Sequence, residues 1–337
     1  LIEPMDTPGP VPDAATEAIA WGIKAVGADT SHRDGAGITV GVLDTGIDAN
    51  HPAFAGVQLI QKDFTGTGSA DTNGHGTHCA GTIFGRDVAG QRIGVARGVT
   101  RALIGKVLAP GKGDTKSIMD AITWAVDNGA NVISMSLGID FPGFVARLEG
   151  MGVPTRAAVS KALNAYRLTV NAYQSQAMAL ANRNQLTGGA CILVAASGNE
   201  SRVTVDPNTS LDIEASPPSI SQGFICVGAL GQDGALLSRA AFSNTNVNIS
   251  APGVAVLSAR ANSQELTRKD GTSMATPHVA GVAALWAQEL QAKNMLNARN
   301  LEGRLTGTAI TSVFAPNTRA ADIGIGLVRA PQPSPVL

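Results

Sequence analysis

The stretch Ile38-Thr-Val-Gly-Val-Leu-Asp44 decides the fold of this chain. Six β-prone residues lead to an Asp, and a Thr-Gly turn follows at 45–46. Four further apolar runs are strand candidates, at 102–108, 132–137, 191–196 and 224–230. Helical patterns lie between such runs, for example at 117–128 and 276–292. Continuous apolar strands that alternate with helices predict an α/β fold with a doubly wound, mostly parallel sheet and helices on both faces.

The composition of the 337 residues excludes several classes of protein. Charged residues make up only 15% and hydrophobic residues 44%, which is too little charge for a disordered chain. Lys and Arg total 25 against 26 Asp and Glu, a net charge of −1, so we expect no nucleic-acid partner. The sequence contains no run of about 18 apolar residues, so we expect no membrane span. No signal peptide is visible after Leu1, and whether a signal or pro-segment precedes it stays open.

We divide the chain into three parts. Residues 1–36 are an N-terminal arm with a short helix expected at 14–26, residues 37–330 are the main domain, and residues 331–337 are a Pro-rich tail. Within the main domain, residues 139–190 form an enlarged segment, in which a Gly/Pro-rich loop at 139–154 precedes a long amphipathic helix. The apolar stripe of that helix, which we expect to be buried, consists of Val159, Leu163, Tyr166, Val170, Tyr173, Ala177 and Leu180.

Three motifs place a reactive side chain at the edge of an element. Asp44 ends the first strand, where open α/β sheets build their sites. His75 lies between glycines at the entrance of a small-residue helix, and Ser273 lies where a loop becomes an apolar helix. His278 is about 140° around that helix from Ser273, so His75 is the better candidate for its base. Together, Asp, His and Ser supply an orienting group, a base and a nucleophile.

Each motif taken alone also has a plainer interpretation. Asp44 is then a turn-forming residue and Ser273 an ordinary helix cap. His75 and His78, three residues apart, are then a pair of metal ligands, although no Glu follows them at the spacing of zinc peptidases.

On these motifs the chain resembles the subtilisin-like serine peptidases, or subtilases. The matching segments are 44–48, 74–81, 195–199 and 271–278, with weaker matches at 134–138, 249–253 and 324–328. The resemblance runs from about residue 37 to residue 330. It implies a serine endopeptidase that hydrolyses peptide bonds through an acyl-enzyme on Ser273. His75 would be the base, Asp44 would orient it, and the Asn199 amide with the Ser273 N–H would hold the oxyanion.

The same resemblance implies how a protein or peptide substrate binds. The substrate backbone would pair with backbone of this chain as an added β-strand, and pockets beside that strand would bind the substrate side chains. The implied substrate-binding residues are Gly111, Lys112, Gly113, Ser136, Leu137, Gly138, Ala196 and Gly198. Glu200 and Glu214 flank the expected specificity pocket. We favour solvated surface charge for both over selection of a basic residue before the cut.

The chemistry implied by the resemblance requires no cofactor, but many subtilases hold structural calcium. Their strong site uses an Asp directly after a His-Pro pair, whereas Ala53 follows His51-Pro52 here, and the neighbouring loop at 84–92 carries two arginines. Hard cations need several oxygen ligands, so we do not expect that site. Calcium elsewhere stays open, as do an upstream pro-segment or an inhibitor as partners.

The three cysteines are Cys79, Cys191 and Cys226, an odd number that cannot form a disulfide framework. We expect three free thiols, with Cys79 as a small buried residue. Free thiols permit a cytoplasmic location, whereas the family is largely secreted, so localisation stays open.

Two other functions remain alternatives. One is a processing peptidase or peptide transamidase of narrow specificity, whose access is restricted by residues 139–190 acting as a rim; the plainer alternative is that this segment packs on the back of the domain. The other is a non-catalytic peptide-binding pseudo-peptidase, against which the intact Asp44, His75, Ser273 and Asn199 argue.

Overall fold

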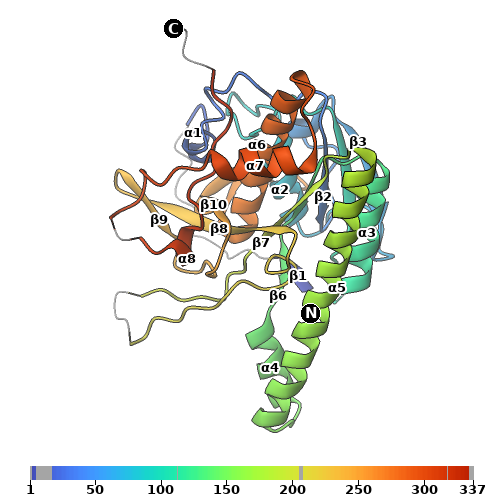
Figure 1. Cartoon of the computed structure of the whole chain (residues 1–337), viewed down its shortest axis with the longest axis vertical. Coiled ribbons are helices and arrows are strands. Elements are labelled where there is room, and N and C mark those ends of the chain that lie inside the picture. Colours follow the sequence, from blue (N-terminus) through green and yellow to red (C-terminus); the bar gives the residue numbers. More distant parts are fainter. Residues whose placement is uncertain (1, 5–16, 112, 205–207, 317, 334–337) are drawn as a thin grey trace.

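The structure is a computed structural model that describes residues 2–4, 17–111, 113–204, 208–316 and 318–333. Its centre is an eight-stranded sheet in the order β10-β8-β7-β5-β2-β4-β3, with β9 beside β8 (Figure 1). All pairs along this path are parallel, and only β9 runs antiparallel to its neighbour. The strands are β2 (Thr39–Asp44), β3 (Gln58–Asp63), β4 (Arg101–Lys106), β5 (Val132–Met135), β7 (Ile192–Ala196), β8 (Phe224–Asp233), β9 (Leu236–Arg239) and β10 (Ile249–Pro252). The predicted doubly wound sheet is confirmed.

Two helical layers cover the sheet. The helices are α1 (Trp21–Ala25), α2 (His75–Phe84), α3 (Thr115–Asp127), α4 (Phe141–Gly150), α5 (Thr155–Thr187), α6 (Thr272–Ala292), α7 (Ala298–Gly307) and α8 (Ala320–Ile323), with a short 3₁₀ helix η1 at Pro52–Phe54. Alternate strand residues supply two separate cores: Val40 and Val42 join the core with α2 and α6, whereas Leu43 joins the core with α3 and α5. The apolar strand runs are therefore buried on both faces, as parallel sheets require.

Two small antiparallel ribbons complete the fold. One pairs β11 (Val256–Ala259) with β12 (Leu266–Lys269), ahead of α6. The other pairs β1 (Ile2–Pro4) with β6 (Leu137–Ile139), so the beginning of the chain lies against the segment that follows β5. The run predicted as one strand at 132–137 is thus divided into β5 and the start of β6.

The helix expected at 14–26 is wrong for half of its described length. Residues 14–16 lie outside the described part, and only Trp21–Ala25 is helical. The reason is that the preceding residues pair with a distant loop: Ala20 donates its N–H to the carbonyl of Arg92, and Arg92 donates to that of Ala18. Tail residues 331–333 have no regular structure, and 334–337 lie outside the described residues.

The loop expected at 139–154 contains a helix, α4. Its Pro lies in the first turn, where a missing N–H is harmless, and the Asp140 side chain accepts a hydrogen bond from the Gly143 N–H. The sequence suggested a loop because glycine and proline are common in turns, but both residues also occur in the first turn of a helix.

The long helix α5 has 33 residues, and its apolar stripe is buried only in part. Tyr173, Ala177 and Leu180 are buried against the core with α3, where Gln176 also donates to the Met119 carbonyl. Val159 and Leu163 are 43% and 58% exposed, because there the main neighbour of α5 is α4 and the two helices project from the body (Figure 1). The expectation that the whole stripe is buried is therefore wrong. Among the described helices, none combines the length and apolarity needed to cross a membrane.

Candidate active site

Asp44 and His75 form a buried pair at the carboxyl end of the sheet. Asp44 is the last residue of β2, and His75 is the first residue of α2. His75 Nδ1 lies 2.7 Å from Asp44 Oδ1, and both side chains are essentially inaccessible to solvent. Burial works to lower the pKa of His75, but the facing Asp44 carboxylate raises it well above its ordinary value. Asp44 therefore orients the ring and favours its protonated form.

Glycines around the pair allow β2 and α2 to approach closely. A Cβ on Gly76 would lie 2.2 Å from the Gly46 carbonyl oxygen and 3.1 Å from the Asp44 Cβ. Gly74 caps α2 with a φ of 92°, which L side chains rarely adopt. Gly76 thus allows the close approach that brings His75 to Asp44, and Gly74 allows the backbone turn that begins α2.

Ser273 lies at the N-terminus of α6, facing the segment between β5 and β6. Its hydroxyl donates to the Ser136 carbonyl at 3.1 Å, and the Ser136 hydroxyl donates to the Ser273 carbonyl at 2.9 Å. Because Ser273 is the second residue of α6, its N–H has no acceptor within the helix. The buried Nε2 of His75 has no partner among the described residues, so it is available to accept a proton.

His278 does not act as a base for Ser273, in agreement with its position around the helix. Its Nδ1 lies 2.8 Å from the Met274 carbonyl, and burial lowers the pKa of His278 to about 4.

Asn199 has the geometry of a hydrogen-bond donor to an oxyanion. Its Oδ1 accepts two hydrogen bonds from Thr272, from the backbone N–H and from the hydroxyl, both at 2.9 Å. Its buried Nδ2 has no partner within the described part of the chain. An unpaired buried donor is unfavourable unless a ligand atom satisfies it. Thr272 was not among the expected site residues, although it directly precedes Ser273.

A buried carboxylate that the motif analysis missed connects the segments of the Asp44–His75 pair. Asp71 accepts from the hydroxyls of Thr45, at 2.9 Å, and Thr77, at 2.6 Å. Burial works to raise the pKa of Asp71, but hydrogen bonds from Thr77 and Gly74 lower it. The sequence signal was an Asp two residues before Asn73-Gly74, a pattern typical of a side-chain-capped turn.

The expected substrate-binding strand has an edge that accepts an extended chain. Residues 2–4 pair with β6 in antiparallel register, with Ile2 opposite Ile139, Glu3 opposite Gly138 and Pro4 opposite Leu137. On the other expected wall, Gly111 lies in a turn with a φ of 67°, and Lys112 is outside the described residues. Gly113 and Ile139 line the same cavity, of about 250 Å³.

The residues that follow β7 form a wall near Asn199. Ala196 is the buried last residue of β7. A Cβ on Gly198 would lie 2.4 Å from Asn244 Nδ2 and 2.5 Å from Glu200 Oε2. The expected solvation of Glu200 is wrong, because this half-buried carboxylate accepts from Asn244 at 2.5 Å and burial raises its pKa. Glu214 is exposed, as expected.

Cys79 lies one turn after His75 and is fully buried. Cys191 and Cys226 are also buried, and all three cysteines are free thiols, as expected. The Cys79 sulfur is 3.8 Å from His75 Nδ1 and donates to the Ser273 carbonyl at 3.5 Å. Asp44, His75 and Cys79 lie close enough to share a metal ion. His78 instead lies against the carbonyls of Val256 and Thr267, so the alternative of a His75–His78 metal pair does not fit.

The strong calcium site of the resembling family does not fit this chain. The Ala53 side chain offers no oxygen, and its carbonyl accepts from the Arg86 N–H at 2.7 Å. The Arg86 side chain donates hydrogen bonds to the carbonyls of Phe84 and Val99.

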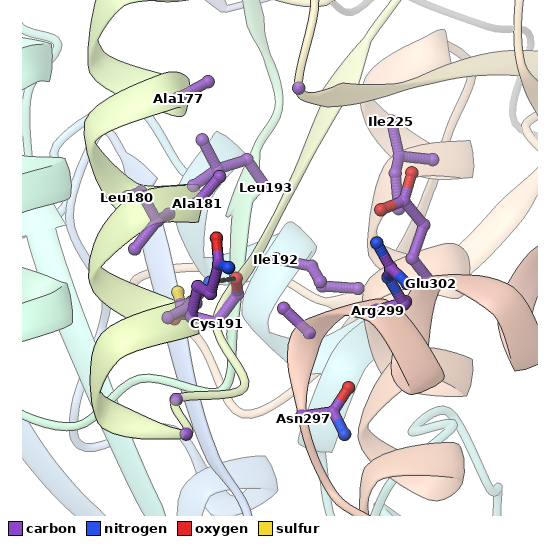
Figure 2. Close-up of a pocket in the computed structure, with 16 residues that line it drawn as sticks. Ala177, Leu180, Ala181, Cys191, Ile192, Leu193, Ile225, Asn297, Arg299 and Glu302 are labelled. Atoms are coloured by element: carbon purple, nitrogen blue, oxygen red, sulfur yellow. Dashed lines mark hydrogen bonds between the residues drawn. The ribbon is translucent and has the colours of Figure 1, made fainter.

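A separate cavity of about 680 Å³ lies at the opposite, amino-terminal end of the strands (Figure 2). Figure 2 shows apolar side chains of α5, β7 and β8 on its walls, with Arg299 and Glu302 of α7 on the side facing α5. Its lining includes neither the Asp44–His75 pair nor Ser273.

Known proteins match the chain over this whole region. The model of the subtilase family matches residues 35–326. M-protease of Shouchella clausii is 32% identical over 323 residues, which cover 93% of this chain and 69% of the relative. Subtilisin BL of Lederbergia lenta is also 32% identical over 323 residues, and the match covers 93% of this chain and 98% of the relative. For subtilisin DY of Bacillus licheniformis the identity is 32% over 301 residues, or 87% and 92% of the two chains. Because these matches span the segments that hold Asp44, His75 and Ser273, the chain belongs to the subtilase family.

Proposed function

We propose that this serine-type endopeptidase cleaves peptide bonds through an acyl-enzyme on Ser273. The Ser273 oxygen attacks the scissile carbonyl while His75 Nε2 takes the hydroxyl proton. Asp44 stabilises the resulting imidazolium. The tetrahedral oxyanion is held by the Asn199 amide and the Ser273 N–H until the C–N bond breaks and His75 returns the proton to the leaving amine. Water, activated by His75, then hydrolyses the ester and frees Ser273.

The observation that carries this proposal is the buried contact of 2.7 Å between Asp44 and His75, which leaves His75 Nε2 unpaired. The unpaired Asn199 Nδ2 supports the oxyanion role independently. The chemistry then requires only side chains and backbone of this chain, and no cofactor.

The test is the Ser273→Ala protein, with a fluorophosphonate label and casein digestion as the two assays. We expect the unsubstituted protein to take one label and digest casein, and Ser273→Ala to do neither while its Tm is retained. Casein digestion by Ser273→Ala would refute the acyl-enzyme, and a chain that binds peptides without taking the label would instead be the pseudo-peptidase.

We further propose that protein or peptide substrates bind in extended form along β6. The antiparallel pairing of residues 2–4 with this edge supports that mode, because backbone hydrogen bonds of the same kind serve any sequence. A pro-segment or an inhibitor would compete for the same edge. Following the family's tendency we propose secretion, with the cytoplasm as the alternative.

Narrow specificity is the second candidate, and one cavity favours it. The space of about 250 Å³ beside β6 is lined by the 113–115 segment and by the α4–α5 hairpin. On the hairpin side, the rings of Phe141 and Tyr166 meet edge to face, 5.5 Å apart. A peptide residue opposite Ile139 projects to the same face as Ile139, toward this cavity.

Two substrates separate broad from narrow specificity. One is a short peptide that ends before the residue opposite Ile139, and the other extends past it with an aromatic residue there. Under narrow specificity, Phe144→Ala raises KM for the longer peptide alone, while Leu163→Ala, an exposed change on the same hairpin, alters neither. Equal effects of Phe144→Ala on both peptides would reject the hairpin as a specificity element.

A further inference from the structure

The loop that follows α2 is held by hydrogen bonds from arginine side chains. Val88 and Gln91 exchange two backbone hydrogen bonds, of 3.0 and 2.9 Å, which close a tight turn at 89–90. The N–H of Arg86, at the beginning of this loop, donates to the Ala53 carbonyl. This is the place where the family resemblance implied a calcium ligand, and the side chain there is a methyl group.

The Arg86 side chain donates hydrogen bonds to backbone carbonyls, one of which belongs to the last residue of α2. Its guanidinium donates to the Phe84 carbonyl at 3.1 Å, to the Val99 carbonyl at 2.9 Å, and to the Arg97 carbonyl. Phe84 is the last residue of α2, so the positive charge also lies at the favourable end of the helix dipole. The helix held in this way is the one that begins at His75.

Arg92 is a buried cation surrounded by carbonyls. It is only 8% exposed, and no carboxylate of the described residues forms an ion pair with it. Its nearest contact is 2.9 Å, to the Ala28 carbonyl, and the carbonyls of Gly94 and Val95 lie at 3.4 Å. Backbone carbonyl oxygens are among the ligands that a calcium ion takes, and here a guanidinium donates hydrogen bonds to them.

We propose that the guanidinium groups of Arg86 and Arg92 take the place of the bound calcium ion, so that the 84–92 loop and the end of α2 are held without metal. The charge stays inside the chain and cannot be removed by a chelator. The stability of this region is then independent of calcium concentration, whatever calcium does elsewhere in the molecule.

The test uses the full chain carrying Ser273→Ala, which prevents self-digestion and leaves the loop unchanged. Hydrogen exchange of peptides covering 84–95 is measured in chelator and in excess calcium, together with Tm. We expect the same protection of these peptides in both conditions. Arg86→Met and Arg92→Met keep the apolar stem without the charge, and each should lower Tm by roughly 5 °C and speed exchange of the loop, with no rescue by calcium.

Arg97→Met is the matched control. Arg97 lies close to Arg92 in the sequence, but its side chain is 45% exposed and pairs with Asp87. It should leave loop exchange nearly unchanged. If calcium protects the 84–95 peptides of the unsubstituted loop, a metal is bound there and the proposal is overturned. It is equally overturned if Arg86→Met and Arg92→Met behave like Arg97→Met. Should a methionine variant fail to fold, Arg92→Lys keeps the charge but not the guanidinium, and an intact loop in that variant would also contradict the role of the guanidinium.

Discussion

Replacing Thr272 with Val should slow catalysis without changing substrate affinity. The Asn199 amide is held by two hydrogen bonds from Thr272. The substitution keeps the backbone bond of 2.9 Å but removes the hydroxyl, and with it both the bond to Asn199 and the bond that the hydroxyl accepts from the Gly198 N–H at 3.2 Å. One neutral hydrogen bond contributes about 1 kcal/mol, with a range of about 0.5–1.5 kcal/mol. If the bond to Asn199 stabilises only the transition state, in which the amide donates to the oxyanion, its loss lowers kcat and leaves KM unchanged. The expected fall in kcat is about 5-fold, within about 2- to 12-fold.

The upper limit for this effect is set by Asn199→Ala, which removes the donor itself and should cost about 10²–10³ in kcat. The assay is steady-state hydrolysis of a chromogenic peptide, with Tm measured in parallel. Thr276→Val is the matched control, because Thr276 is a buried threonine one turn later in α6 whose hydroxyl donates to the backbone carbonyl of Thr272 and not to Asn199. A wild-type kcat in Thr272→Val, or an equal fall in Thr276→Val, would refute the role of Thr272 in orienting Asn199.

Three further predictions follow from the contacts of His75. The base must be neutral and Asp44 raises its pKa, so kcat/KM should fall as pH drops through a value above 6.5, and a profile flat from about pH 5 to 9 would contradict this role. Bulky mercurials should inactivate slowly through the buried Cys79, whose sulfur is 3.8 Å from the ring, and Cys79→Ser should be resistant; unchanged sensitivity would implicate another thiol. Gly76→Ala should abolish turnover, because its Cβ would lie 2.2 Å from the Gly46 carbonyl; a fully active variant would show that the approach of β2 and α2 tolerates a side chain.

The reactive residues could be predicted because each carries a local signal. Asp44 ends an apolar run, His75 lies between glycines, and Ser273 begins a helix of small and apolar residues. Thr272 and Asn244 were missed because a Thr before a Ser, and an Asn in a polar loop, have no distinctive pattern. Their importance comes from partners far along the chain: Thr272 contacts Asn199 across 73 residues, and Asn244 contacts Glu200 across 44.

The α4–α5 hairpin shows the same limit for whole elements. The spacing of apolar residues in α5 correctly predicted a long helix, since helical periodicity depends only on neighbours along the chain. The spacing could not predict how much of the helix packs on the rest of the domain, and so it wrongly predicted burial for Val159 and Leu163. Burial depends on what packs against a face, and for the first half of α5 the main neighbour is α4.

The sequence by itself determined the parallel sheet and the reactive residue types, because apolar runs and glycine-flanked motifs act over a few neighbouring residues. Only the tertiary structure decided which atoms meet: Asp44 with His75 across 31 residues, Ser273 with Ser136 across 137, and residues 2–4 with β6. Hydrogen bonds require donor and acceptor within about 3 Å, and only the packing of the helices on the sheet sets positions to that precision. For the same reason the arginines of the 84–92 loop were visible in the sequence, but the carbonyl oxygens that surround them were not.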